Sequence, residues 1–219
     1  MIKRENKIKV SNINQESVLN FEKYGELYKE CLFFDLEHYV YKKPVCVGVF
    51  GCCYYDENER EIKVTQYMIE NSADAIDILH LSKDYFVDML ENHNKKHVVT
   101  FSGNNDYTII NYLFNKYKID FKIEDHFNNI DLQKEYEKEK GICIGLKALE
   151  KEFDILRDSE LISGSNLAKT FHKIMKDRDY AERMPQCKKE KILLYNEQDV
   201  VSLFHIYTSW KKILPETEA

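Results

Sequence analysis

The chain has 219 residues, which is long enough for one well-buried core, so we expect a single domain rather than two small ones. Its 32 lysines and arginines against 38 aspartates and glutamates give a net charge of −6, which argues against a basic coat that binds nucleic acid indiscriminately. Any site for a polyanion must therefore be local.

The cysteines and the apolar runs indicate in which cellular compartment we expect the protein. The six cysteines include no Cys-x-x-Cys pair, and several lie in apolar runs where a free thiol packs as a small hydrophobe. The first residues lack the apolar core of a signal peptide, and no apolar run approaches the ~20 residues of a membrane span. We therefore expect a soluble, cytoplasmic protein without a membrane partner, and the sequence predicts no particular protein partner.

Residues 1–30 begin polar and lysine-rich and then carry apolar side chains. These apolar side chains are Val18, Leu19, Phe21, Leu27 and Tyr28. We expect an N-terminal extension that packs on the domain without contributing chemistry, and a domain that spans residues 31–212.

The stretch from Cys31 to His38 reads as a buried strand that carries two acids. Side chains alternate between the two faces of a strand, so Asp35 and Glu37 share one face. Two neighbouring like charges in an apolar strand raise at least one carboxyl pKa unless a strong cation lies between them, and a divalent metal is the obvious cation. The alternative is an edge or end strand whose acids simply reach water.

Apolar spacing predicts the other elements along the chain. The predicted strands span residues 31–38, 45–51, 62–68, 97–101 and 127–132. The predicted helices span residues 72–90, 106–117, 146–153, 167–175 and about 186–210. The first three strands would form a meander, and the fourth strand with the helix after it would form a strand–loop–helix unit.

The last predicted helix holds a further acid. Tyr195 and Asp199 are four residues apart and therefore lie on one helical face. Ile192 and Leu203 belong to the same stripe, so Asp199 is an acid on a largely apolar side and needs a partner. The alternative is a helix that is apolar nearly all round, with one acid near its rim.

Asp106 stands at the start of the helix that follows the fourth strand. Taken alone, it is an ordinary first-turn acid, since carboxylates suit the positive end of a helix. Its position between the acidic strand and the late Tyr-x-x-x-Asp pattern nevertheless completes a recognisable order of motifs.

This order resembles the DEDDy exonucleases of the DnaQ-like, ribonuclease H-like superfamily, and it is most similar to the bacterial YprB-type ribonuclease H-like domain proteins. The resemblance covers nearly the whole chain after residue 30. Residues 34–37, 99–106 and 195–199 are similar to the three motifs, and residues 129–132 and 145–150 look like the fifth strand and the following helix. It implies an α/β ribonuclease H-like fold with a mixed five-stranded sheet flanked by helices.

The resemblance also implies the chemistry. Asp35, Glu37, Asp106 and Asp199 would bind two Mg²⁺ or Mn²⁺ ions, and Tyr195 would orient the attacking water. Hard cations prefer such oxygen ligands, and two of them can support in-line phosphodiester hydrolysis. The implied activity is a metal-dependent 3′→5′ exonuclease on single-stranded DNA or RNA that uses a two-metal-ion mechanism.

Two segments depart from the family pattern. His38 stands where these enzymes usually carry a threonine, and residues 39–43 replace their glycine-rich continuation. The second motif reaches its acid one residue early, so Asp106 is the ligand if the loop has a one-residue gap, and Tyr107 occupies that position if it has none. The sequence alone leaves both alternatives open.

Substrate binding requires positive charge near these acids. Residues 169–191 carry eight lysines and arginines against four acids, a local net charge of +4 that could track a phosphate backbone. A solvated lysine-rich helix face is the commoner explanation of such a run. The predicted substrate-binding residues are His38, Ser102, Asn104, Asn105, Lys169 and Lys173.

Two other functions remain open. The same acids could serve a structure-selective endonuclease. A catalytically weakened nucleic-acid-binding or regulatory module, altered at the second motif, is the other alternative, because a fold does not determine a function.

Overall fold

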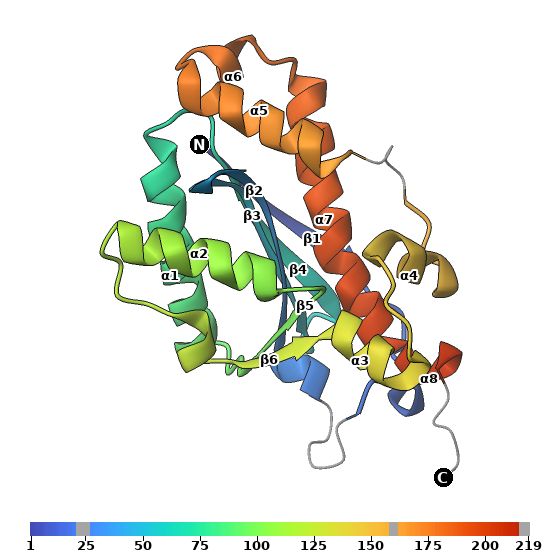
Figure 1. The fold of residues 1–219 in the computed structure, drawn as a ribbon. Helices are drawn as coiled ribbons and strands as arrows, with labels where there is room; N and C mark the ends of the chain where they lie inside the picture. Colours follow the sequence, from blue (N-terminus) through green and yellow to red (C-terminus); the bar gives the residue numbers. More distant parts are fainter. Residues whose placement is uncertain (21–26, 158–161, 215–219) are drawn as a thin grey trace.

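The computed structural model describes residues 1–20, 27–157 and 162–214, and Phe21 lies outside them. A central sheet runs through the molecule with helices on both sides (Figure 1). The strands are β1 (Ile2–Lys9), β2 (Cys31–Tyr41), β3 (Lys43–Asp56), β4 (Glu61–Met68), β5 (His97–Thr100) and β6 (Asn128–Asp131). The α-helices are α1 (Asp74–Glu91), α2 (Asn104–Lys116), α3 (Leu132–Lys140), α4 (Leu146–Glu152), α5 (Gly164–Lys176), α6 (Tyr180–Arg183), α7 (Gln186–Thr208) and α8 (Trp210–Ile213).

The strand order is β1-β4-β3-β2-β5-β6. The pairs β1–β4, β4–β3 and β3–β2 are antiparallel, whereas β2–β5 and β5–β6 are parallel. The predicted α/β fold with a mixed sheet flanked by helices is therefore confirmed. β2, the acidic strand, lies inside the sheet rather than at its edge.

The predicted number of five strands is wrong, because β1 adds a sixth strand at the edge beside β4. Every second residue of β1 is exposed, and its charged side chains are typical of edge strands that avoid pairing with other chains. Its polar residues also contact α7, where Glu197 binds Arg4 at 3.3 Å and Asn6 at 3.0 Å. The N-terminal extension thus contributes a strand, and the domain boundary at residue 30 stays a prediction.

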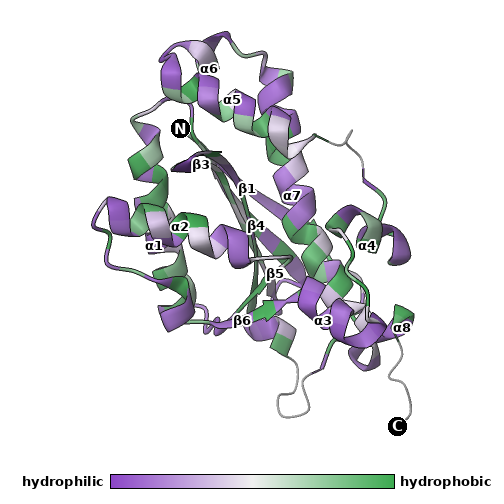
Figure 2. Cartoon of the chain, viewed as in Figure 1, coloured by the Kyte–Doolittle hydropathy of each residue, from purple (hydrophilic) through white to green (hydrophobic). Residues whose placement is uncertain are grey.

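The two faces of the sheet bury two separate apolar clusters. Leu32 and Phe34 of β2 belong to the cluster that includes residues of α1 and α2, whereas Phe33 belongs to the cluster that includes α3, α4 and the second half of α7. Because both faces are covered, the central strands are apolar on both sides, and Figure 2 shows them largely green beside the mostly purple α3. An acid in β2 therefore lies between packed layers.

The cysteines and the helices bear on the predicted compartment. All six cysteines are free, and burial raises the pKa of the Cys46 and Cys52 thiols to about 12, so these two are packing residues. None of the helices in the described part of the chain combines the length and the apolar character that a bilayer span requires. The cytoplasmic location stays a prediction.

Candidate active site

Three carboxylates from distant parts of the chain meet where β2 passes α7. One oxygen atom each from Asp35, Glu37 and Asp199 lies within 4.8 Å of the other two. Asp35 and Glu37 point to the same side because they alternate with Leu36 along β2, and Asp199 projects from the middle of α7. Carboxylate oxygens in such a group are suitable ligands for a hard divalent cation.

A buried amide positions the first acid. The Asn196 Nδ2 donates to Asp35 Oδ2 at 3.0 Å, and the Gln66 Nε2 donates to Asn196 Oδ1 at 2.8 Å. Gly51 lies between Asp35 and Gln66 in the strand register, and a Cβ atom there would stand 2.0 Å from Asn196 Oδ1. Only glycine therefore leaves room for the amide that holds Asp35.

A tight turn between β5 and α2 precedes Asp106, the predicted fourth acid. Ser102 has the left-handed φ of 56°, its backbone N–H donates to Asp131 Oδ1 at 2.9 Å, and a Cβ on Gly103 would meet Thr100 Oγ1 at 2.2 Å. α2 starts immediately after this turn, so Asp106 stands in its first helical turn and is buried. Its charge acts on Glu37, although it is not one of the three carboxylates within 4.8 Å.

Tyr107 lies in the core. Its ring centroid is 6.3 Å from that of Phe34, and its side chain belongs to the apolar cluster between the sheet and α2. Of the two residues that the sequence left as alternatives, Asp106 is the one whose charge acts on Glu37, and its role as a metal ligand stays a prediction.

Burial dominates the electrostatics of the cluster. Loss of solvent and then the charge of Asp199 raise the pKa of Asp35 to about 7. Burial followed by the charges of Asp35, Asp199 and Asp106 also raises the pKa of Glu37 well above its usual value. Burial and the charges of Asp35, Asp131 and Asp199 do the same to Asp106. These acids need a cation to stay ionised together at neutral pH.

Two protein cations already contact Asp199. Lys147 of α4 and Arg157, in the segment after α4, both bind Asp199, and Arg157 also binds the buried Glu150, with Nε 2.7 Å from Oε2. They neutralise Asp199, yet Asp35 and Glu37 keep raised pKa values. The sequence had marked Lys147 and Glu150 only as part of a family-like segment, and Arg157 was missed.

Tyr195 completes the site beside these cations. Its ring lies 4.6 Å from Lys147 Nζ and 5.4 Å from the guanidinium carbon of Arg157. Burial and the charges of Asp199 and Glu37 raise the pKa of its phenol, so the hydroxyl stays protonated at neutral pH. It can donate a hydrogen bond but cannot act as a general base.

The other predicted residues fall into two groups. His38 and Asn105 lie side by side with Nε2 and Nδ2 3.4 Å apart, and Asn104 accepts from Lys134 at 3.3 Å, so these side chains gather at the start of α2. Ser102 belongs to the turn just before them. Lys169 and Lys173 instead lie on α5 and line a separate pocket, described below.

The fold and the carboxylate cluster define an α/β protein of the ribonuclease H type. A model of the RNase_H superfamily matches residues 32–211, and the chain belongs to this family. Comparison with curated proteins gives no match. Members of the superfamily generally hydrolyse phosphodiester bonds, and its nucleases typically use divalent metals. Membership therefore indicates a nuclease that acts on nucleic acids.

Proposed function

We propose that this chain is a DnaQ-like, DEDDy-type 3′→5′ exonuclease that hydrolyses single-stranded DNA or RNA with two divalent metal ions. The observation that carries the proposal is the convergence of Asp35, Glu37 and Asp199 within 4.8 Å, although Asp199 lies more than 160 positions from the other two in sequence. The similarity of the three motifs to those exonucleases supports the polarity and the single-stranded substrate. We also propose a cytoplasmic location, since free thiols persist in reducing compartments.

The donor set fits Mg²⁺ or Mn²⁺. Asp35, Glu37 and Asp199 would hold the metal, with Asp106 as the fourth acid. Burial, and after it the neighbouring carboxylates, raises the pKa of Asp35, Glu37 and Asp106, and a bound cation would favour their ionised forms. When bound, two such ions supply an activated water and stabilise the leaving 3′ oxygen.

The protein groups around the acids have separate tasks. Asn196 holds the Asp35 carboxylate in one orientation, so this ligand is already in place when substrate binds. Tyr195, as a neutral phenol, would orient the attacking water through its hydroxyl. Lys147, whose side chain is 28% exposed, offers an ammonium group to the negative charge that builds on the reacting phosphate.

One observation favours a second candidate. Lys147 and Arg157 already neutralise Asp199, as would suit a site that no longer depends on metal. In that case the chain would be a catalytically weakened nucleic-acid-binding or regulatory module.

The test is cleavage of end-labelled DNA and RNA oligonucleotides, single-stranded and duplex, with Mg²⁺ or Mn²⁺. Wild type should shorten single strands stepwise from the 3′ end, Asp35→Asn should not, and Asp120→Asn, an exposed acid away from the site, should behave as wild type. Cleavage at internal positions would instead indicate a structure-selective endonuclease. Binding without cleavage by wild type would favour the module.

A further inference from the structure

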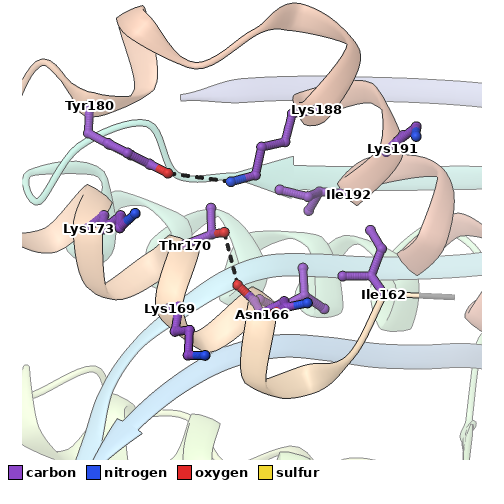
Figure 3. Close-up of a pocket in the computed structure, with 10 residues that line it drawn as sticks. Ile162, Asn166, Lys169, Thr170, Lys173, Tyr180, Lys188, Lys191 and Ile192 are labelled. Carbon is purple, nitrogen blue, oxygen red and sulfur yellow. Dashed lines mark hydrogen bonds between the residues drawn. The ribbon is translucent and has the colours of Figure 1, made fainter. Parts of the chain in front are cut away.

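A pocket of about 380 Å³ lies between α5, α6 and the start of α7 (Figure 3). Lysines from two helices line it: Lys169 and Lys173 come from α5, and Lys188 and Lys191 come from α7. The carboxylate cluster described above contributes no residue to this pocket.

Tyr180 holds two of these lysines. The Lys188 Nζ donates to the Tyr180 hydroxyl at 3.4 Å, as Figure 3 shows, and the Lys173 and Lys188 ammonium groups lie 5.5 and 5.8 Å from the centre of the same ring. A ring that contacts ammonium groups from two different helices helps to keep both of them at the pocket. It is thus a positioning residue for positive charge.

Three of the four lysines at the pocket have no acid partner among the described residues. In the described part of the chain, no carboxylate lies within salt-bridge distance of Lys169, Lys173 or Lys188. Lys189 on the same helix is different, because it is buried and binds Glu70 at 2.7 Å. Lys189 therefore serves packing, whereas Lys169, Lys173 and Lys188 gather positive charge in a chain whose net charge is −6. Such a local cluster attracts a polyanion.

The lining of the pocket is apolar as well as cationic. Leu167 and Ile192, which are both buried, line it together with the lysines. A lining that combines apolar side chains with ammonium groups suits a ligand that alternates phosphates with sugars and bases, better than it suits a small inorganic anion.

One face of α7 carries residues of both the pocket and the carboxylate cluster. Lys188, Ile192, Tyr195 and Asp199 follow one another at intervals of four, three and four residues, which places them on one stripe of α7. Ile192 and Asp199 are seven residues apart, or about 10 Å along the helix axis. A strand bound in the pocket thus lies within a few nucleotides of the acids.

We propose that this lysine pocket binds the phosphate backbone of a single nucleic-acid strand whose reacting end lies at Asp35, Glu37 and Asp199. The identity of the ligand rests on the proposed function, whereas the binding of a polyanion rests on the pocket itself. Tyr180 contributes by holding Lys173 and Lys188 in place.

Fluorescence anisotropy in EDTA tests the pocket without requiring catalysis. The probes are 5′-fluorescein oligo(dT) and oligo(rU) of twelve nucleotides and a duplex of the same length. Lys173→Gln and Lys188→Gln should each weaken single-strand binding about tenfold and reduce the slope of log affinity against log salt by about 0.7. Lys176→Gln is the matched control, because Lys176 is exposed on the same helix and does not line the pocket.

Substitutions of Tyr180 test whether the positions of Lys173 and Lys188 matter for binding in addition to their charges. Tyr180→Phe should keep most of the affinity for the single strands, because the ring remains. Tyr180→Leu should reduce that affinity about as much as Lys173→Gln or Lys188→Gln does. Thermal melts of every variant show whether a loss of binding comes from unfolding.

The outcomes distinguish this inference from the proposed function. In one outcome, wild type fails to cleave any strand with Mn²⁺ while the pocket variants still bind the single strands more weakly than wild type does. That result would contradict the exonuclease proposal and support the pocket inference. If wild type cleaves and the pocket variants bind and cleave as it does, the pocket inference is overturned. It is also overturned if wild type binds none of the probes, if Lys176→Gln loses as much affinity as the pocket variants, or if the duplex binds as tightly as the single strands.

Discussion

Asn196 and Asp35, 161 positions apart in sequence, form a hydrogen bond of 3.0 Å that joins α7 to β2 at the carboxylate cluster. Gln66 binds the other end of the Asn196 amide, and Gly51 leaves the space for it. The orientation of the first acid thus depends on three residues that cannot themselves bind metal through a carboxylate.

This arrangement predicts that Asn196→Ala lowers turnover while substrate affinity changes little. The variant should lose about 1–3 kcal/mol of stability, because the buried Gln66 amide loses a partner. Steady-state kinetics and chemical denaturation measure both effects. Gly51→Ala should reproduce the kinetic defect by displacing the amide, and normal turnover in both variants would show that Asp35 needs no such support.

The pKa shifts predict how stability depends on pH in metal-free protein. Asp35 has a folded pKa of about 7, above the ~3.9 of an unfolded aspartate, so the folded state holds its proton more tightly. Its contribution to stability is full below pH ~4 and is lost as the pH rises through about 7. With EDTA, the free energy of unfolding should fall across this window.

Bound Mn²⁺ should offset that loss, because it favours the ionised carboxylates and binds only the folded state. Melting temperatures between pH 4 and pH 8, with EDTA and with MnCl₂, provide the measurement. Asp35→Asn should flatten the EDTA curve relative to wild type. Wild-type curves that stay parallel with and without metal would contradict both the repulsion among the acids and the metal site.

The second motif yields a prediction for Asp106. Asp106→Asn keeps the size of the side chain but removes a buried charge near Asp35, Asp131 and Asp199. Activity should fall by orders of magnitude with little loss of stability, and Tyr107→Phe should keep both because its ring packs in the core. Cleavage assays on a single strand with Mn²⁺ compare the two. Loss of activity in Tyr107→Phe but not in Asp106→Asn would reverse the assignment.

The sequence predicts the acids better than their surroundings, for physical reasons. Asp35, Glu37 and Asp199 stand out because acids interrupt apolar patterns of known period, and burial makes such interruptions costly. The apolar pattern does not predict β1, because an edge strand is stabilised by backbone pairing and needs no apolar run. The role of Asn196 depends on Gly51 and Gln66, which only strand register brings together.

The sequence gives no sign that Arg157 belongs to the site. It follows α4 outside any regular element, so no periodic pattern marks it, and its partners are seven and 42 positions away. Gly51, one of two glycines in the apolar strand β3, and Gln66 in β4 were available signals for the Asn196 contact, since glycine within a strand often marks a close approach.

The two cations at Asp199 should differ in what they do. Arg157 is 9% exposed and binds Glu150, which is 3% exposed, so Arg157→Met leaves a buried carboxylate unpaired and should cost about 3–5 kcal/mol. Lys147 is 28% exposed, and within the described residues its one ion pair is with Asp199, so Lys147→Met should cost no more than about 1 kcal/mol. Chemical denaturation separates these expectations.

Activity then decides between the two candidate functions. In an exonuclease, Lys147→Met should tighten Mn²⁺ binding, because a competing cation leaves Asp199, and should lower turnover, because the reacting phosphate loses an ammonium group. Calorimetric titration with MnCl₂ and single-turnover cleavage measure the two effects, with the exposed Lys151→Met on the same helix as control. If Lys147→Met leaves Mn²⁺ binding and turnover unchanged, Lys147 only neutralises Asp199. If neither wild type nor the variant binds Mn²⁺, the cations replace the metal and the module is the better description.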